Sequence, residues 1–190
     1  MRALALTFDD GPDAAWTPRL LDALARAGAR ATFFPIAPRA AAHPDLMARL
    51  VAEGHEVGLH CEEHVRHSTR DAAWGRADTA RALETMRGMG LAPRLWRTPW
   101  GDVAPWTAHV AAEHGLRIVG WTADTHDWRG DTAQEMFDAL RSRLQPGAIV
   151  LAHDGIGPGA RRADARETVG FVGLAAGHAA ARQMVLTSLA

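Results

Sequence analysis

The sequence predicts one α/β domain over residues 1–190, a distorted (β/α) barrel with seven parallel strands. Strand-like apolar runs alternate with helical patterns along the whole chain, which is typical of a mainly parallel sheet covered by helices. Hydrophobic residues make up 47% of the 190 residues, enough for a sizeable core. No repeat, low-complexity tract or linker divides the chain.

The first half of the chain shows clear helix boundaries. Thr17-Pro18 combines an N-cap residue with proline at the first helical position, and Gly28 ends that helix. Pro44 opens a second helix, which stops at Gly54. The expected strands are the apolar runs around these helices, at Ala3–Phe8, Ala31–Ile36 and His55–Leu59.

The second half continues the same alternation. A long helix is expected over Asp71–Met89, with Gly90 as its C-terminal signal. Further helical patterns cover Thr107–His114, Asp131–Leu144 and Asp164–Ala181. The remaining strands are expected at Pro93–Arg97, Arg117–Trp121, Ala148–Leu151 and Met184–Thr187.

The ends of the strands distinguish a barrel from an open sheet. In an open sheet the site gathers where the strand order reverses, so only a few strand ends contribute. Here five strand ends carry polar candidates, which converge most easily at the mouth of a barrel. These candidates are Asp9 and Asp10 after the first strand, His60 and His64 after the third, Arg97 at the end of the fourth, Asp127 after the fifth and His153 after the sixth.

Two of these segments suggest a metal site. Adjacent Asp9 and Asp10 at a strand end project differently, so one can bind a cation while the other stays free as a base. His60 and His64 stand four residues apart, a spacing that lets both imidazoles share one metal. Taken singly, each segment is equally compatible with an ordinary turn or a solvated loop.

The segment from His60 to His64 also contains the inverted zincin pattern, which would make Glu63 the base. That pattern needs a long helix, whereas Val57-Gly58-Leu59 is typical of a strand end. We therefore expect Glu63 to have no catalytic role.

In chain order, five segments resemble the polysaccharide deacetylases of the NodB-homology group, carbohydrate esterase family 4. The matching segments are Thr7–Gly11, His60–His64, Arg97–Trp100, Asp124–Trp128 and Leu151–His153. The closing run Met184–Thr187 is similar to the last strand of that family. The resemblance covers nearly the whole chain and implies a distorted barrel of seven or eight strands.

The resemblance implies metal-dependent hydrolysis of an acetamide on an N-acetylglucosamine-containing carbohydrate, with acetate as a product. Asp10, His60 and His64 would hold the metal, with zinc favoured over Co²⁺ or Ni²⁺.

By the same resemblance, the remaining motif residues have distinct roles. Asp9 would be the general base, oriented by Arg97, and His153 the general acid, supported by Asp127. The substrate-binding residues would be Trp100, whose backbone N–H stabilises the oxyanion, with Trp128 and Leu151 around the acetyl methyl group.

The chain departs from the family at Cys61, where the family usually has Ser or Thr. A thiol is a weaker hydrogen-bond donor than a hydroxyl, and we expect Cys61 to pack rather than to bind metal or react.

We expect surface or capping roles for the other histidines, His43, His55, His67, His109, His114, His126 and His178. Core or groove-edge positions are expected for Trp16, Trp74, Trp96, Trp106 and Trp121.

The net charge and the lengths of the apolar runs limit the classes of partner that the chain is expected to bind. The formal net charge of −1 gives no indication of nucleic acid or an anionic membrane as a partner. No apolar run approaches the ~20 residues of a membrane span. The acidic pair Asp9-Asp10 comes too early for a signal peptide, so we expect a cytoplasmic chain, or a secreted one if an export signal has been trimmed.

Two other functions remain open at this point. One is a superfamily amidohydrolase acting on a small N-acyl or cyclic amide, although such relatives tend to lose the paired aspartates. The other is a carbohydrate-binding barrel without turnover, which would not need the base, the acid and both of their partners. The choice among chitooligosaccharide, peptidoglycan fragment and small glycoconjugate depends on loop shape, which the sequence does not define.

Overall fold

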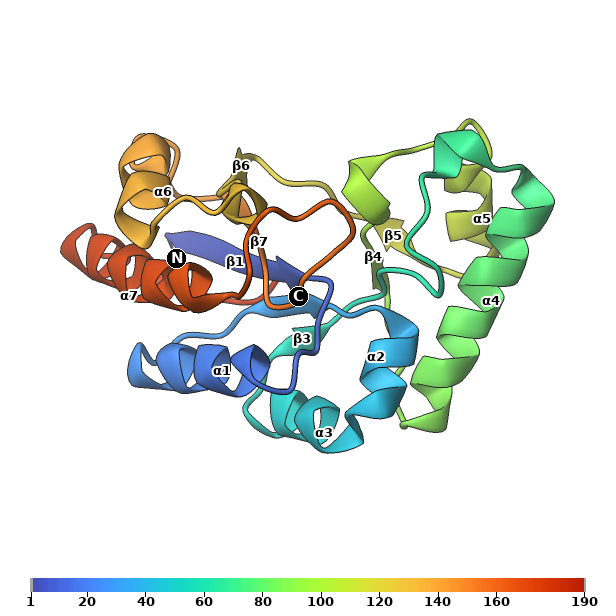
Figure 1. Cartoon of the computed structure of the whole chain (residues 1–190), viewed down its shortest axis with the longest axis horizontal. Coiled ribbons are helices and arrows are strands. Elements are labelled where there is room, and N and C mark those ends of the chain that lie inside the picture. Colours follow the sequence, from blue (N-terminus) through green and yellow to red (C-terminus); the bar gives the residue numbers. More distant parts are fainter. Residues whose placement is uncertain (1, 190) are drawn as a thin grey trace.

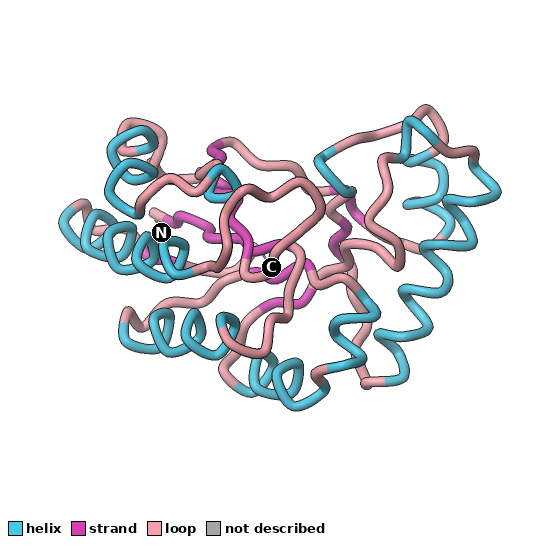
Figure 2. The backbone as a smooth tube through the Cα atoms, viewed as in Figure 1, coloured by secondary structure: helices cyan, strands magenta, loops and turns pink. Residues whose placement is uncertain are grey.

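The computed structural model describes residues 2–189 and shows a parallel sheet with helices packed around it (Figures 1 and 2). The central strand β1 (Ala3–Asp9) lies between β2 (Thr32–Phe34) and β7 (Ile149–His153). Beyond these, β3 (Glu56–Val57) pairs with β2, and β6 (Ala123–Asp124) pairs with β7. All of these pairs are parallel, so the carboxyl ends of the strands meet on one side.

Two further strands extend this row and curve it towards a barrel. Parallel β4 (Leu95–Trp96) and β5 (Arg117–Ile118) form their own ladder, and a parallel bridge joins Leu59 to Trp96. The row therefore runs β6-β7-β1-β2-β3-β4-β5, seven strands as predicted. Within residues 2–189 no ladder closes β5 onto β6, so the barrel is distorted and open at that seam.

The last strand, β8 (Val185–Leu186), confirms the strand expected at Met184–Thr187. It pairs with the first residues of β1, on the edge that β2 occupies further along. The backbone N–H of Arg30 donates to Leu186, which joins β8 to the entrance of β2. The C-terminal strand therefore fills the amino-terminal end of the gap between β1 and β2.

The sequence reasoning missed β6 and counted the strand at Met184–Thr187 as the seventh, so the seven strands of the barrel row are not the same seven. This strand has only two residues, and one of them is Asp124, so it lacks any apolar alternation. It forms because β7 offers a free edge, to which Ala123 and Asp124 pair. Asp127 accordingly follows β6 and not the fifth strand of the chain.

The observed helices lie outside the sheet (Figure 2) and keep the predicted order. One short helix was missed, α2 (Ala37–Ala42), because it is a single alanine-rich segment directly before Pro44. The others are α1 (Trp16–Arg26), α3 (Pro44–Ala52), α4 (Ala72–Gly88), α5 (Thr107–Glu113), α6 (Ala133–Leu140) and α7 (Arg166–Ala181). No helix in residues 2–189 has both the length and the apolar character to cross a membrane.

The predicted N-cap of α1 is also wrong. The helix begins at Trp16, one residue before Thr17, and Asp13 Oδ1 accepts the backbone N–H groups of Ala15 and Trp16. The hydroxyl of Thr17 instead donates to Asp154 at 2.6 Å. This bond joins α1 to the loop after β7.

The core lies between the sheet and the helices. Phe8 on β1 packs against Phe33 on β2 with ring centroids 5.2 Å apart, and both are almost fully buried. Burial of each such side chain contributes about 1.5–3 kcal/mol, so these rings fix the relative position of the two strands. The loops that follow the strands are thereby held in a constant arrangement.

Candidate active site

The carboxyl ends of the strands surround a pocket of about 410 Å³. Its lining brings together residues from the ends of β1, β6 and β7 and from the loops after β3 and β4. The predicted site residues among them are Asp9, Asp10, His60, His64, Trp100, Trp128, Leu151 and His153. The convergence expected from the strand ends is therefore present.

The two aspartates after β1 diverge, as adjacent residues at a strand end should. Asp9 is the last residue of the strand, whereas Asp10 adopts a left-handed backbone with φ of 72°. Asp9 Oδ1 accepts a hydrogen bond from Arg97 at 2.9 Å. Asp10 Oδ1 instead faces the two imidazoles. The carboxylates thus face different partners although they are neighbours in sequence.

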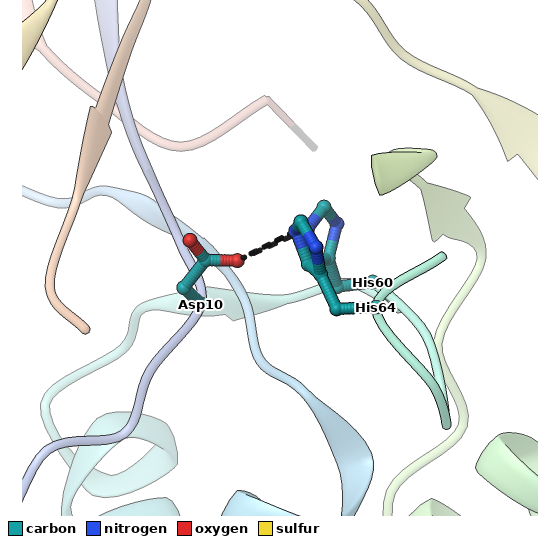
Figure 3. A group of neighbouring side chains, drawn as sticks. All are labelled: Asp10, His60 and His64. Carbon is teal, nitrogen blue, oxygen red and sulfur yellow. Dashed lines mark ion pairs between the residues drawn. The ribbon is translucent and has the colours of Figure 1, made fainter. Parts of the chain in front are cut away.

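Asp10, His60 and His64 form a possible metal site (Figure 3). Asp10 Oδ1 lies 3.3 Å from Nε2 of His60 and 3.2 Å from Nε2 of His64. One ligand atom from each residue lies within 4.8 Å of the others, and Asp10 Oδ1 is buried without a hydrogen-bond partner. Two imidazole nitrogens and one carboxylate oxygen are a donor set that suits zinc, so these residues fit a divalent metal.

Neighbouring groups orient the ligand nitrogens. Nδ1 of His60 lies 2.6 Å from the carbonyl oxygen of Arg97. A carbonyl only accepts hydrogen bonds, so Nδ1 carries the proton and the Nε2 lone pair is directed to the site. Burial disfavours the charged form of Asp10, but His60 and His64 outweigh this effect and hold its pKa well below the usual range.

The loop between the two histidines is held by α4. The Asp78 carboxylate accepts the backbone N–H groups of Glu62 and Glu63, at 3.2 and 2.8 Å. Burial raises the pKa of Asp78 to about 6, although these bonds oppose the change. The Glu63 side chain is 54% exposed and pairs with Arg81, which agrees with its exclusion as a base.

Cys61 is buried and lies outside the group of possible metal ligands. It forms a parallel bridge with Ile36, and burial raises the pKa of its thiol. These contacts agree with the packing role expected for it, because a reactive thiol needs an accessible, readily ionised sulfur.

Arg97 is fully buried behind Asp9. Its Nη1 donates to Asp9 and to the Thr7 hydroxyl, at 2.9 and 2.7 Å. Nε and Nη2 donate to the carbonyl oxygens of Val119 and Gly120. A guanidinium with so many partners cannot rotate freely, so it fixes the direction of the Asp9 carboxylate.

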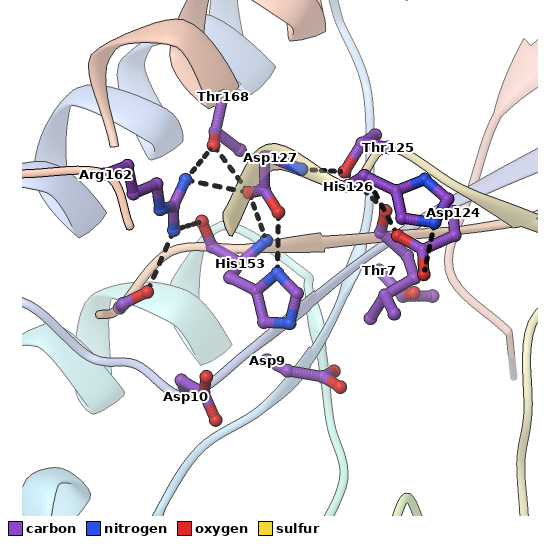
Figure 4. Close-up of polar contacts among 12 residues, drawn as sticks. Thr7, Asp9, Asp10, Asp124, Thr125, His126, Asp127, His153, Arg162 and Thr168 are labelled. Atoms are coloured by element: carbon purple, nitrogen blue, oxygen red, sulfur yellow. Dashed lines mark hydrogen bonds and ion pairs between the residues drawn. The ribbon is translucent and has the colours of Figure 1, made fainter. Parts of the chain in front are cut away.

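His153 and Asp127 form the second predicted pair (Figure 4). Nδ1 of His153 donates to Asp127 Oδ1 at 2.7 Å, and the backbone N–H of His153 donates to Oδ2 at 2.9 Å. Burial disfavours the imidazolium, but Asp127 outweighs it and raises the pKa of His153 to about 9. Burial also disfavours ionisation of Asp127, yet His153 and Arg162 help lower its pKa to about 2.

The predicted substrate residues line the same pocket. Trp100 is 40% exposed and has a left-handed φ of 55°, which a bulky side chain rarely adopts. Its ring meets the edge of His64 at 4.2 Å and lies under the guanidinium of Arg66 at 4.6 Å. Trp128, which lies in the segment after β6, and Leu151, in the middle of β7, also line the pocket.

The structure corrects the expected surface position of three histidines and agrees with the expected position of Trp121. His55, His67 and His178 are buried, not on the surface. His67 stacks on Trp106 at 4.7 Å, and burial lowers its pKa to about 4. His126 lies outside the pocket lining, 3.7 Å from Asp124. Trp121 lines the pocket, in agreement with a groove-edge position.

Sequence reasoning assigned no role to several residues that support the site from behind. They are Thr7 behind Arg97, Asp78 behind the histidine loop, and Arg162 with Thr168 behind Asp127. Arg162 stands beside Arg161 in a glycine-rich loop, and no local pattern separates a buried arginine from an exposed one.

Fold and site together define the class of protein, a hydrolytic enzyme on a parallel β/α barrel. Residues 1–119 match the family model described as polysaccharide deacetylase. A chitooligosaccharide deacetylase from Bradyrhizobium sp. (strain ANU 289) is 38% identical over 166 residues, which cover 85% of this chain and 74% of that protein. A peptidoglycan-N-acetylglucosamine deacetylase from Bacillus cereus is 33% identical, over 79% of this chain and 55% of that protein.

A solved structure shows the same architecture. The family 4 carbohydrate esterase from Streptomyces lividans, in complex with acetate, has a TM-score of 0.86 and 30% identity. The match covers 96% of this chain and 90% of that one. The chain belongs to the polysaccharide deacetylase family, the metal-dependent hydrolases of carbohydrate esterase family 4.

Proposed function

We propose that this enzyme hydrolyses the acetamide of N-acetylglucosamine units in a carbohydrate, releasing acetate and a free amine. One observation carries the proposal. Asp10 faces His60 and His64, while the neighbouring Asp9 is turned to Arg97, and His153 lines the same pocket. This arrangement provides a cation site, a base and an acid around one cavity.

Asp10, His60 and His64 would hold the metal, and the donor set favours zinc. Zinc in such a site lowers the pKa of water to roughly 7 and polarises a carbonyl group. The chain contributes three ligands, which leaves positions open for water and substrate.

Asp9 accepts the proton of the attacking water. Its carboxylate lies beside the ligand Asp10 and is held in direction by Arg97 through a bond of 2.9 Å. Because Arg97 is fully buried and bonded to three other groups, Asp9 is directed without having to move during the reaction.

His153 donates a proton to the departing amine, which is otherwise too basic to leave. Nδ1 is occupied by Asp127, so Nε2 is the nitrogen that delivers the proton. In Figure 4 the ring extends from Asp127 towards the side on which Asp9 and Asp10 lie. Base and acid therefore flank the space in which the scissile amide binds.

Trp128 and Leu151 form the apolar part of the wall and suit an acetyl methyl group. Trp100 and Trp121 offer indole surfaces at the same pocket, which suit the apolar face of a pyranose ring. Both curated relatives are named for N-acetylated glucosamine substrates, chitooligosaccharide and peptidoglycan, which supports the same substrate class here.

Acetate release tests the proposal. The protein is stripped with a chelator, zinc is added back, and acetate is measured with N-acetylglucosamine oligomers, peptidoglycan fragments and small N-acyl or cyclic amides. We expect zinc-dependent release from the oligomers or fragments. Release from small amides alone would favour the amidohydrolase alternative. Tight sugar binding without release would show a carbohydrate-binding barrel.

A further inference from the structure

The loop between β7 and α7, residues 154–165, forms one wall of the pocket. It starts directly after His153, and in Figure 1 it arches across the carboxyl ends of the central strands. The residues of this loop that line the pocket are Gly155, Gly157, Pro158, Gly159, Ala160 and Arg162. The shape of this wall and the position of the acid therefore depend on the same segment.

Arg162 turns from this loop into the protein interior, where its side chain is only 6% exposed. Nη1 donates to Asp127 Oδ2 at 2.8 Å and also to the Thr168 hydroxyl. Nη2 donates to the carbonyl oxygens of His153 and Gly155, both at 2.9 Å. Figure 4 shows the guanidinium spanning from Asp127 to the backbone of the loop.

The Asp127 carboxylate consequently lies between two cationic groups. Its Oδ1 accepts from the His153 ring, and its Oδ2 accepts from Arg162, Thr168 and the backbone N–H of His153. A planar guanidinium can donate to four acceptors in fixed directions, whereas a lysine ammonium has only three donors on a flexible stem. The chemistry of this position is therefore specific to arginine.

We propose that Arg162 is a positioning residue for the reaction, which holds Asp127 against His153 and fixes the start of the β7–α7 loop as a wall of the pocket. The proposal rests on the proposed function because it takes His153 as the acid. Arg162 also shares the negative charge of Asp127. Because Arg162 offsets part of this charge, the pKa of His153 is lower than it would be if Asp127 paired with His153 alone.

The test compares three variants with the wild type at matched zinc content. Arg162→Met removes the charge and the four bonds, and Arg162→Lys keeps the charge alone. Arg161→Met removes the same charge from an exposed neighbour in the same loop. The pKa of His153 is measured by NMR, with His153→Gln to assign its signal. The charged groups that face His153 are Asp127 and Arg162, with Asp9 at the end of β1 and Asp10 directly after it.

In Arg162→Met we expect the pKa of His153 to rise by roughly half a pH unit or more, because Asp127 then pairs with His153 alone. The alkaline limb of kcat should move up equally, and kcat at neutral pH should fall by about two- to threefold because proton donation becomes harder. Arg162→Lys should keep the wild-type pKa but raise KM, since the wall loses its bonds. Arg161→Met should match the wild type in all three measurements.

An unchanged or lower pKa of His153 in folded Arg162→Met would overturn the proposal. A wild-type KM in Arg162→Lys would overturn the role in holding the loop. Failure of the proposed function has a different signature, namely no acetate release by the wild type. The NMR titration needs no turnover, so it tests Arg162 in that case as well.

Discussion

The pocket has an acid side, with Asp127 and His153, and a metal side, with Asp10, His60 and His64. The two sides differ in how many hydrogen bonds the chain makes to their carboxylates. On the acid side, both carboxylate oxygens of Asp127 accept hydrogen bonds from other residues of the chain. On the metal side, Asp10 Oδ1 and His64 Nδ1 are buried and have no hydrogen-bond partner within residues 2–189. The Asp127 carboxylate is therefore satisfied by the chain itself, whereas Asp10 Oδ1 is free to bind a cation.

This contrast shows why the same residue types serve different purposes. A histidine paired with a buried carboxylate favours its charged form, as Asp127 raises the pKa of His153 to about 9 despite burial. A pair of histidines whose free nitrogens converge on one carboxylate oxygen is suited to hold a cation, the arrangement of His60 and His64 around Asp10. The contrast also predicts which substitutions disturb metal binding and which disturb only the chemistry.

The largest effects are expected at the metal ligands. Asp10→Ala and His60→Ala should lose both zinc and turnover, with acetate release reduced at least ~1,000-fold, because the activated water depends on the ion. Zinc content by elemental analysis and the rate of acetate release check this expectation. Either variant retaining full zinc content would show that the cation site is wrongly assigned.

Asp9→Asn should separate turnover from metal binding. The amide keeps the shape of the side chain but cannot accept the proton, so the rate should fall by roughly 100- to 10,000-fold. Zinc content should stay near the wild-type value, because Asp9 faces Arg97 and not the histidines. Substantial activity in this variant would remove Asp9 as the base.

His153→Ala should reduce turnover by roughly 100-fold with zinc retained, because the acid side is built independently of the ion.

In the wild type, His153 is protonated below its pKa of about 9, so turnover should fall as the pH rises through about 9. The raised pKa also means that the pair with Asp127 stabilises the fold fully below pH 6.5 and that this stabilisation is lost towards pH 9. Rate profiles and unfolding at several pH values provide the measurements.

The smallest effect is expected at Asp78, which lies behind the histidine loop. In Asp78→Asn the amide NH₂ would face a backbone N–H of Glu62 or Glu63, and zinc affinity should fall roughly 10- to 100-fold. Competition with a chelator measures this affinity. Glu63→Gln, an exposed change in the same loop, is the matched control and should bind zinc normally. Equal affinity in both variants would show that the loop needs no anchor from α4.

Much of the site follows directly from sequence. Asp9, Asp10, His60, His64, Arg97, Asp127 and His153 come together as expected, because they stand at or near strand ends and parallel strands place those ends on one side. The pairs Asp9–Arg97 and Asp127–His153 were expected from the family resemblance, and the structure forms both. Such features depend on residue type and on the order of elements, both of which the sequence carries.

Tertiary structure alone decided which distant residues support these groups. Asp78, Arg162 and Thr168 reach the site from a helix, a loop and another helix, and their sequence surroundings look like ordinary surface segments. The two-residue strand β6 likewise exists because β7 provides an edge, not because its own residues favour a strand. Local sequence specifies propensity and charge, whereas burial and the choice among possible partners arise only when the whole barrel packs.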